Sequence, residues 1–390
     1  MKYNFDEIIP REGTDCFKYD YRKDYFGTTD VIPMWVADMD FKTPDFVMEA
    51  IRKRTEHEIL GYSLRAEGFY QSAIDWFRNR QKWEISSEWM VFTPGVVPAL
   101  NFAINAFSKS GEKVIVQPPV YHPFFHVIKG NGRKVLENPL KLANGKYTMD
   151  LDHLAGKIDQ SVKMILISHP HNPVGRVWHK EELHDLASLC IENKIIMISD
   201  EIHSDLILPG HEHIPLASIS EEIAGMTVTC VAPSKTFNLA GMSASLAVIS
   251  NERLRKRYSH QIEQAHLWLG NIFGNIALET AYRHGNDWLN QLLGYLSGNV
   301  DYLRSFLEKE LPRIKLVEPE ATYLLWLDMS ALEMTDDELK QFMIEKAGLG
   351  CSDGPSFGTG GSGYQRMNVA CPRSVLKQAL NQLKKAVDQL

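Results

Sequence analysis

The stretch Pro233-Ser234-Lys235-Thr236-Phe237-Asn238-Leu239-Ala240-Gly241 places one lysine between a short apolar run and a glycine. The preceding residues 227–232, Thr-Val-Thr-Cys-Val-Ala, are β-branched or apolar, and this composition predicts a buried strand. Ser234 and Lys235 would then emerge just beyond the carboxyl end of that strand, where open α/β sheets bind their ligands. Burial among apolar neighbours lowers the pKa of a lysine, so Lys235 can form a Schiff base with an aldehyde cofactor. The alternative is an ordinary solvated lysine, because unpaired lysines are mostly exposed.

Length and composition limit the possible classes of protein. The chain has 390 residues, more than the roughly 250–300 at which a single core stops growing, so we expect two domains. An apolar content of 44% and a charged content of 23% are typical of globular proteins. The net charge of -7 gives no reason to expect a nucleic-acid partner. The five cysteines are scattered and form no C-x-x-C pair, so we expect neither a disulfide framework nor a metal site.

The amino terminus and the hydropathy pattern predict a location. Residues 1–7 mix charges and lack the apolar core of a signal peptide. No stretch approaches the roughly 18 uninterrupted apolar residues of a membrane span. We therefore expect a cytoplasmic protein that contacts no membrane and acts on a small molecule.

From Met90 onward, short apolar strands alternate with helical stretches, which is typical of βαβ units and a largely parallel sheet. The expected strands lie near residues 90–92, 113–117, 164–168, 195–199, 227–232 and 245–249. Polar or turn-forming clusters follow five of them, at residues 93–95, 118–121, 169–173, 200–203 and 234–235. These clusters should converge on one edge of the sheet.

Two helices and an irregular segment are expected before this sheet. Residues 34–41 form an apolar and acidic run without regular spacing, which predicts an irregular arm. Thr43 as the cap and Pro44 as the first helical residue predict the start of a helix, and a second helix is expected around residues 71–80.

The last third of the chain differs in character from the middle. Long helical runs follow Asn251, and the glycine-rich residues 354–363 predict an active-site loop. We expect an amino-terminal arm of residues 1–45, a large domain of residues 46–288, and a small carboxyl-terminal domain of residues 289–390 on which the arm packs.

Two of the strand ends offer groups that can bind a cofactor. Thr93-Pro94-Gly95 opens a helix with little side-chain bulk, so the backbone N–H groups of the helix start can meet a phosphate. A plain connection is the alternative, because short glycine turns before helices mostly serve as connections. The segment is not the usual nucleotide loop, since neither G-x-G-x-x-G nor G-x-x-x-x-G-K-[ST] occurs. Asp200 can hold a proton on a pyridine nitrogen, or it can cap a helix.

Three further side chains have an ordinary interpretation beside a functional one. Asn172 can donate to a ring hydroxyl or a substrate carboxylate, or it can occupy a turn before a proline. Tyr121 can stack on a flat cofactor, or it can pack in the interior. Arg366 can form a two-pronged salt link with a substrate carboxylate, or it can be a surface charge.

In this order, the segments resemble those of the pyridoxal-phosphate enzymes of the aspartate aminotransferase fold, from Trp35 to Arg373. Within that superfamily, the chain resembles the cystathionine β-lyase branch known as MalY/PatB. The matching segments are WVADMDF at residues 35–41, HNPVGRVW at residues 171–178, DEIH at residues 200–203 and SKTFNLAG at residues 234–241. The resemblance implies an α/β fold, with a mostly parallel seven-stranded sheet in the large domain and a smaller α/β carboxyl-terminal domain.

The resemblance also implies a role for each site residue. Lys235, the Schiff-base lysine and proton shuttle, would be catalytic together with Asp200 and Tyr121. The site for pyridoxal 5'-phosphate would comprise Lys235, Val96, Val97, Tyr121, Asn172, Asp200, His203, Ser234 and Tyr62. The amino-acid substrate would contact Arg366, Asn172, Ala37 and Tyr121, with Arg366 on its α-carboxylate. Because Tyr62 matches a tyrosine that reaches the phosphate of the other subunit, the resemblance implies a homodimer with active sites at the interface.

The implied activity is cleavage of the Cβ–S bond of cystathionine or related S-substituted cysteines, which yields a thiol, pyruvate and ammonia. An aminotransferase is the alternative, because the lysine, aspartate and arginine serve both reactions. Aminotransferases usually have a tyrosine and an arginine where this chain has His203 and Ser243, which favours the lyase. A regulatory protein that acts through partner binding is a third hypothesis, although no basic stripe or DNA-reading helix is evident.

Overall fold

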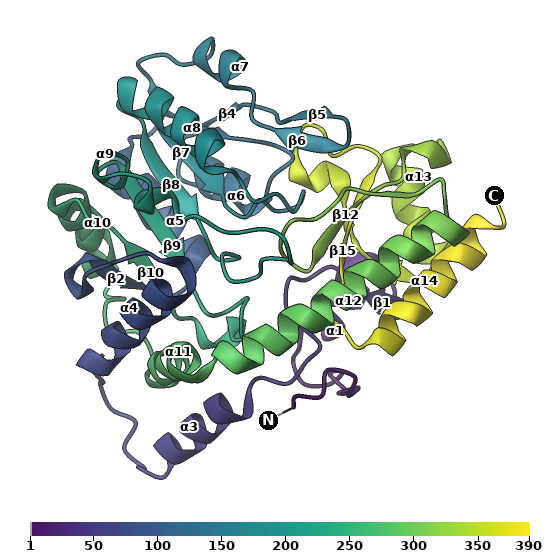
Figure 1. The fold of residues 1–390 in the computed structure, drawn as a ribbon, viewed down its shortest axis with the longest axis horizontal. Helices are drawn as coiled ribbons and strands as arrows, with labels where there is room; N and C mark the ends of the chain where they lie inside the picture. The colour runs from purple at the N-terminus through teal and green to yellow at the C-terminus, as the bar shows by residue number, and fades with distance from the viewer. Residues whose placement is uncertain (1) are drawn as a thin grey trace.

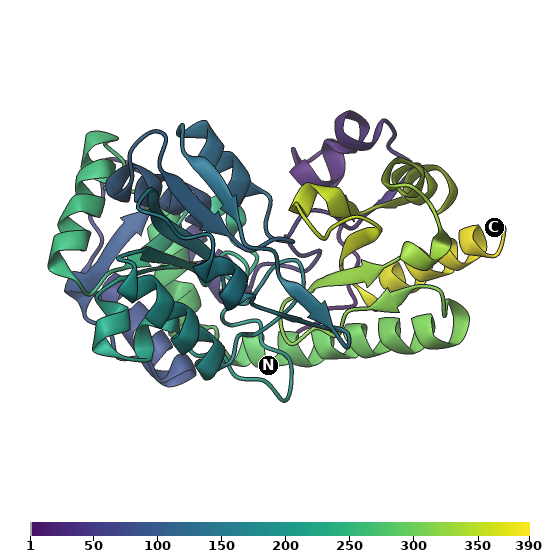
Figure 2. The same cartoon turned by 90° about the horizontal axis from the view of Figure 1, so that it is seen from above.

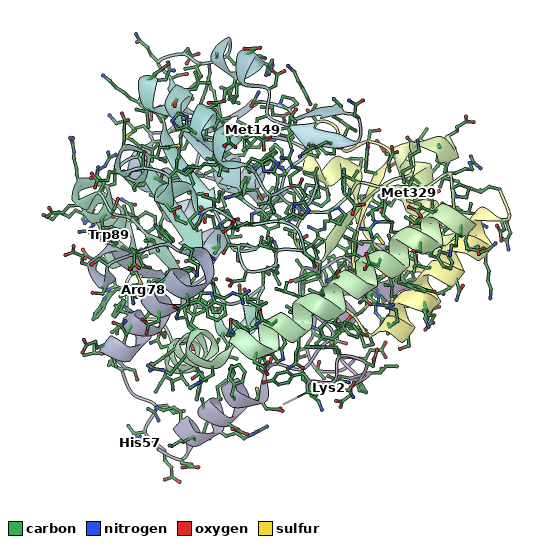
Figure 3. All side chains as sticks on the ribbon, in the orientation of Figure 1. Lys2, His57, Arg78, Trp89, Met149 and Met329 are labelled. Carbon is green, nitrogen blue, oxygen red and sulfur yellow. The ribbon has the colours of Figure 1, made fainter. Side chains whose placement is uncertain are left out.

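The computed structural model describes residues 2–390, so Met1 of the predicted arm lies outside the described part. Figures 1 and 2 show a larger part on one side and a smaller part on the other. The helix α12 (Asn286–Glu310) begins beside α11 (Ile272–His284) and runs along the smaller part. Figure 3 shows that side chains occupy the space between the ribbons of the larger and the smaller part.

A seven-stranded sheet, counted over the described residues, forms the centre of the larger part in the order β2-β10-β9-β8-β7-β3-β4. In that order the strands are Met90–Thr93, Ser245–Val248, Thr227–Val231, Ile196–Asp200, Val162–Ser168, Lys113–Val116 and Lys134–Glu137. Strand β10 is antiparallel to both neighbours, and the other pairings are parallel. The predicted α/β fold with a mostly parallel sheet is confirmed, and the six expected strands lie within two residues of their predicted bounds.

The strand β4 is the one that the sequence pattern did not reveal. It lies at the edge of the sheet and pairs only with β3. Lys134 is exposed and the next three residues are only partly buried, so the segment lacks the continuous apolar character of the inner strands.

Helices cover both faces of this sheet, and the side-chain alternation of β7 explains why. Met164 and Leu166 pack in the same cluster as α5 (Val96–Phe107) and α10 (Glu252–Gln264). Ile165 and Ile167 pack in the cluster of α8 (Lys180–Glu192) on the other face. Successive residues of a strand point to opposite faces, so a strand buried on both sides is apolar throughout.

The first long helices differ in detail from the prediction. Helix α4 (Glu67–Gln81) contains the predicted residues 71–80. Helix α3 (Asp45–Thr55) begins one residue later than expected, because Pro44 has an extended ψ of 134° and occupies the cap position itself. Thr43 caps nothing, and its hydroxyl donates to Asn238 O at 3.4 Å. The predicted cap at Thr43 was therefore wrong.

The smaller part is built on an antiparallel sheet in the order β11-β12-β15-β14. These strands are Lys315–Leu316, Leu324–Asp328, Tyr364–Asn368 and Ser352–Asp353, and α14 (Arg373–Val387) packs beside α12. The arm joins this part, because β1 (Ile32–Pro33) pairs in parallel with β13 (Leu349–Gly350). The domain boundaries near residues 45 and 289 stay a prediction.

Shorter elements complete the chain. They are α1 (Phe17–Asp20), α2 (Arg22–Phe26), α6 (Pro123–Gly130), α7 (Leu151–Ala155), α9 (Glu221–Ala224) and α13 (Asp336–Gln341). The hairpin of β5 (Lys141–Ala143) and β6 (Lys146–Thr148) extends from the larger part toward the smaller one (Figure 1). None of the helices in residues 2–390 is both long enough and apolar enough to cross a membrane.

Candidate active site

A cavity of about 190 Å³ lies at the carboxyl ends of β7, β8 and β9. The predicted site residues that line it are Ala37, Val96, Val97, Tyr121, Asn172, Asp200, His203, Ser234 and Lys235. Tyr62 and Arg366 are the two that do not. The structure therefore brings together the polar clusters of five strand ends, as expected for an open α/β sheet.

Lys235 lies under the irregular arm. Its Nζ donates to Ala37 O at 2.6 Å. Asn238 fixes the arm at this point, because its Oδ1 accepts from Met39 N at 3.0 Å and its Nδ2 donates to Met39 O at 2.9 Å. Burial lowers the pKa of Lys235 to about 8, with Asp38 opposing this change and Arg366 adding to it. A substantial fraction of this amine is therefore neutral near physiological pH.

Asp200 ends β8 with its carboxylate toward the cavity. The amide of Ile202 donates to its Oδ1 at 3.2 Å. Burial raises the pKa of Asp200 to about 7, although the Ile202 amide and the charge of Lys235 act in the opposite direction. A buried carboxyl of this kind can hold a proton on a basic ring nitrogen that enters the cavity.

The start of α5 provides backbone donors. Gly95 precedes the helix with a φ of 129°, a conformation that an L side chain rarely adopts. Its amide donates to Ser245 Oγ at 3.0 Å, which fixes the loop. Val96 and Val97 follow as the first helical residues, and amides in this position have no carbonyl partner within their own helix. The helix start is therefore suited to an anion such as a phosphate.

Arg366 lies behind Asn172. Its Nη1 donates to Asn172 Oδ1 at 3.1 Å, and its Nη2 donates to Trp35 O at 2.7 Å and to Ser352 Oγ at 3.2 Å. Its Nε is buried without a hydrogen-bond partner among residues 2–390. Burial lowers the pKa of Arg366 to about 10. The guanidinium stays charged at neutral pH and is suited to a carboxylate.

Aromatic side chains complete the cavity wall. Burial raises the pKa of Tyr121 to about 12, so its hydroxyl is neutral at physiological pH. Tyr323 was not predicted as a site residue, yet its hydroxyl donates to Ala37 O at 3.1 Å, beside Lys235. Its position directly before β12, in an apolar run, gave no local sign of this contact. Ser168, whose Oγ accepts from Asn172 N at 3.1 Å, was also missed, although it ends an expected strand.

Tyr62 lies outside the cavity and is 99% exposed. It lines a neighbouring surface hollow, which shares Pro94 and Ser243 with the cavity wall. Within one chain, therefore, Tyr62 is at the outer side of the site.

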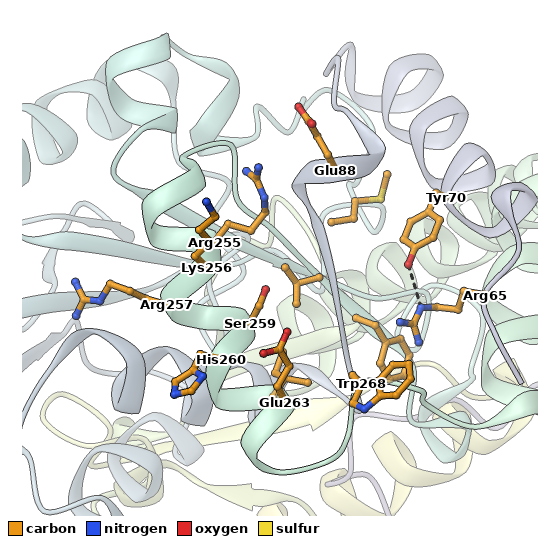
Figure 4. A pocket seen from close by; sticks show the side chains of 14 residues that line it. Arg65, Tyr70, Glu88, Arg255, Lys256, Arg257, Ser259, His260, Glu263 and Trp268 are labelled. Atoms are coloured by element: carbon orange, nitrogen blue, oxygen red, sulfur yellow. Dashed lines mark hydrogen bonds between the residues drawn. The ribbon is translucent and has the colours of Figure 1, made fainter. Parts of the chain in front are cut away.

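A larger hollow of about 680 Å³ contains none of the predicted site residues (Figure 4). One of its cations, Arg65, donates to Tyr70 Oη at 3.2 Å and to Leu269 O at 2.8 Å. Because this hollow contains none of the predicted site residues, it is a weaker candidate than the smaller cavity.

The sequence of the chain is similar to known proteins over nearly its whole length. The family model "Aminotransferase class I and II" matches residues 29–383. The chain belongs to this family. It is 42% identical to cystathionine β-lyase PatB of Bacillus subtilis over 98% of the chain and 100% of PatB. It is 31% identical to protein MalY of Escherichia coli over 99% of each chain. The predicted membership of the MalY/PatB group is confirmed.

The fold of this aminotransferase-family chain is also similar to that of a solved enzyme. The PLP-bound C–S lyase from Staphylococcus hominis superimposes with a TM-score of 0.93 and 36% identity, over 99% of this chain and 98% of that one. The predicted aspartate-aminotransferase-like fold is confirmed.

The cavity residues fit pyridoxal phosphate. Lys235 provides an amine for the aldehyde, and Val96 and Val97 provide amides for the phosphate. Asp200 is a buried carboxylate for the ring nitrogen. No group of three histidine, cysteine or carboxylate side chains in residues 2–390 is arranged to hold a metal ion.

Proposed function

We propose that this chain is a pyridoxal-phosphate-dependent carbon–sulfur β-lyase. Its reaction would be the α,β-elimination of cystathionine or related S-substituted cysteines to a thiol, pyruvate and ammonia. The observation that supports this most directly is the set of charged groups at the site: Lys235 and Asp200 line the cavity, and Arg366 donates to Asn172 in its wall. Among the described residues, none of the three has an ion-pair partner. Charged groups left in this way are candidates for contacts with a ligand of opposite charge.

Two of the three charges, those of Asp200 and Arg366, have a partner in the proposed complex. Pyridoxal phosphate, when bound, supplies an electron sink for the electrons of the substrate Cα–H bond. Asp200 holds a proton on the ring nitrogen, which keeps the ring able to accept those electrons. Arg366 binds the α-carboxylate with its guanidinium fork, and Asn172, within hydrogen-bond distance of that fork, orients the same end of the substrate.

Lys235 has the properties of the base in this scheme. Its lowered pKa leaves part of the amine neutral, and only the neutral amine can take a proton from the substrate Cα. Ala37 O, which accepts from Nζ, holds the amine over the cavity. Tyr121 would stack on the ring, and His203 and Ser234 would line the cofactor site.

The arrangement of exposed residues supports a homodimer. Tyr62 lies outside its own cavity, and the exposed apolar residues Leu60 and Leu267 line the same surface hollow. A second copy that covers this face would bring its own Tyr62 to the phosphate end of the neighbouring cavity. We further propose a cytoplasmic location, with neither nucleic acid nor membrane as a partner.

The similarity to PatB and to the Staphylococcus hominis C–S lyase supports elimination over amino transfer. The test is to incubate the protein with cystathionine, cystine and short S-alkylcysteines and to follow pyruvate and thiol. Failure to turn over any of them would refute the lyase proposal. An aminotransferase would instead convert the bound cofactor to its amine form with an amino acid that has no β-leaving group, which is seen as a stoichiometric loss of the cofactor absorbance.

A further inference from the structure

The segment of residues 318–322 connects the antiparallel sheet of the smaller part to the loop that follows β7. The amides of Glu320 and Ala321 both donate to Gly175 O, at 2.8 and 3.0 Å. Gly175 has a φ of +72°, and a Cβ at this position would lie 3.2 Å from Pro319 Cα. A side chain at this position would press on Pro319, and the positive φ would add backbone strain, so the close contact of the two backbones depends on glycine here.

A buried ion pair lies directly beside this contact. Arg176 Nε donates to Glu320 Oε2 at 2.9 Å, and Val177 N donates to the same oxygen at 2.8 Å. The Arg176 Nη2 group donates to Glu182 Oε2 at 2.7 Å, and Nη1 donates to Tyr147 O. The side chains of Arg176 and Glu320 are only 3% and 10% exposed. We call this pair the Arg176–Glu320 clamp.

The charges of the clamp are mutually satisfied, in contrast to those of the cavity. Burial opposes ionisation of Glu320, but the Val177 amide and the charge of Arg176 hold its pKa below the ordinary value. Glu320 therefore remains charged near neutral pH. Buried ion pairs of this kind often add little stability compared with apolar residues of the same volume, but their directional bonds fix one arrangement of the elements that they join.

Both ends of the clamp lead to the proposed carboxylate site. Asn172 lies four residues before Arg176 in the same loop. Trp326 lies six residues after Glu320, on β12, where it pairs directly with Arg366 on β15. The two ends meet where Arg366 Nη1 donates to Asn172 Oδ1 at 3.1 Å.

The β5–β6 hairpin links the same elements a second time. Tyr147 on β6 accepts the Arg176 guanidinium with its backbone oxygen, and its hydroxyl accepts from Trp326 Nε1 at 3.3 Å. Tyr147 thus contacts both Arg176 of the clamp and β12, the strand that pairs with Arg366 on β15. A shift of the clamp would therefore be transmitted to both members of the carboxylate site.

We propose that Arg176 and Glu320 are positioning residues, which set the spacing between Asn172 and Arg366 and thereby determine the affinity for the substrate α-carboxylate. The inference rests on the proposed function for the role of Arg366, but it holds for elimination and amino transfer alike. Neither Arg176 nor Glu320 touches the reacting atoms. Their effect should appear in the binding of the carboxylate and should be small for the rest of the substrate.

The test variant is Glu320→Gln in the full-length holoenzyme. Glutamine can still accept from the Val177 amide, but it removes the negative charge opposite Arg176. Binding of 2-aminoisobutyrate, which has no α-hydrogen and therefore is not turned over, is compared with binding of isopropylamine, the matched amine without the carboxylate, by calorimetry. We expect the amino acid to bind about 10- to 100-fold more weakly, as for small misplacements of a binding group, with the amine affected less than twofold. The KM for turnover should rise with little change in kcat.

Two control variants use neighbouring charges. Glu318→Gln changes an exposed carboxylate in the same segment, which pairs with Arg304. Lys146→Met removes an exposed amine that reaches Glu320 Oε1 at 3.5 Å from outside the clamp. Both controls should keep the wild-type ratio of the two affinities. If Glu320→Gln does not fold, Arg176→Lys, which loses the fork but keeps the charge, should show the same selective loss.

The possible outcomes separate this inference from the proposed function. Equal weakening of both ligands by Glu320→Gln, or no weakening of either, would refute the positioning role. A wild-type protein that does not prefer the carboxylate ligand would refute the role of Arg366 and this inference with it. A selective loss in a protein that forms no pyruvate would support the clamp and refute the lyase activity alone.

Discussion

Lys235 of the cofactor-free protein should titrate near pH 8, and not near its ordinary value of 10.5. The cause is burial, and three neighbouring charges modify it: Asp38 and Asp200 raise the pKa, and Arg366 lowers it. At pH 7, a pKa of 8 leaves roughly one amine in ten neutral, about 300 times the fraction at a pKa of 10.5. This difference gives Lys235 its expected reactivity as a nucleophile and base.

The assay measures the rate of acylation of each lysine between pH 6 and 10, with mass spectrometry to resolve the sites. Reaction of Lys235 should rise through an inflection near pH 8, whereas ordinary exposed lysines continue to rise through pH 10. Two variants test the effect of the neighbouring charges by the direction in which the inflection of Lys235 shifts. Asp200→Asn should move the inflection to lower pH, and Arg366→Met should move it to higher pH. A wild-type inflection above pH 10, or a change in the same direction in both variants, would refute the reasoning.

The same pKa predicts how stability depends on pH. Folded Lys235 loses its proton near pH 8, whereas the unfolded chain keeps it up to about 10.5, so between these values the unfolded state binds more protons. Stability contributed by this residue therefore rises with pH across that window. Below pH 8 the buried charge costs at most about 3 kcal/mol, and less where water in the open cavity hydrates it. Lys235→Met should raise the free energy of unfolding of the cofactor-free protein at pH 7, as measured by urea denaturation.

Three further predictions concern the holoenzyme. Lys235→Ala should still bind pyridoxal phosphate, but borohydride should no longer attach the cofactor to the chain; covalent attachment in mass spectra would contradict the assignment. Asp200→Asn should slow pyruvate formation from cystathionine on the order of 10²–10⁴-fold with an unchanged circular dichroism spectrum, and an unaltered rate would exclude a role in holding the ring proton. Tyr62→Phe should lose the cofactor on dialysis with about tenfold weaker affinity, whereas Tyr21→Phe, another exposed tyrosine, should behave as wild type.

Much of the fold could be predicted because its signals are local. Inner strands such as β9 are buried at every residue, and this favours an unbroken run of apolar or β-branched residues that is visible in the sequence. The site residues that follow those strands could be predicted for the same reason, since the topology of an open sheet brings their carboxyl ends together. The edge strand β4 was not predicted because none of its residues is fully buried and its apolar run is short.

Other features could not be predicted because they depend on contacts between distant residues. Tyr323 contacts Ala37 across 286 residues, and Arg176 contacts Glu320 across 144. Neither pair leaves a periodic pattern or a motif in either segment. The prediction for Thr43 was wrong because a local pattern was present but not realised. The pattern was that of a helix cap, whereas the hydroxyl of Thr43 bonds to distant Asn238.

The distribution of buried charge gives these observations a common basis. At the clamp, Arg176 and Glu320 satisfy each other, so the charge there holds the fold in one arrangement. At the site, burial moves the pKa values of Lys235, Asp200 and Arg366 toward those that favour the neutral forms, and none of the three has an ion-pair partner in the described chain. A ligand that supplies a carboxylate to Arg366 and a protonated ring nitrogen to Asp200 would stabilise the charged forms of both side chains. It would therefore raise the pKa of Arg366 and lower the pKa of Asp200. The paired charges therefore position the site, and the unpaired charges bind the ligand. A substitution in the clamp should alter the spacing of the site residues, whereas a substitution of Lys235, Asp200 or Arg366 should alter the affinity for a charged ligand.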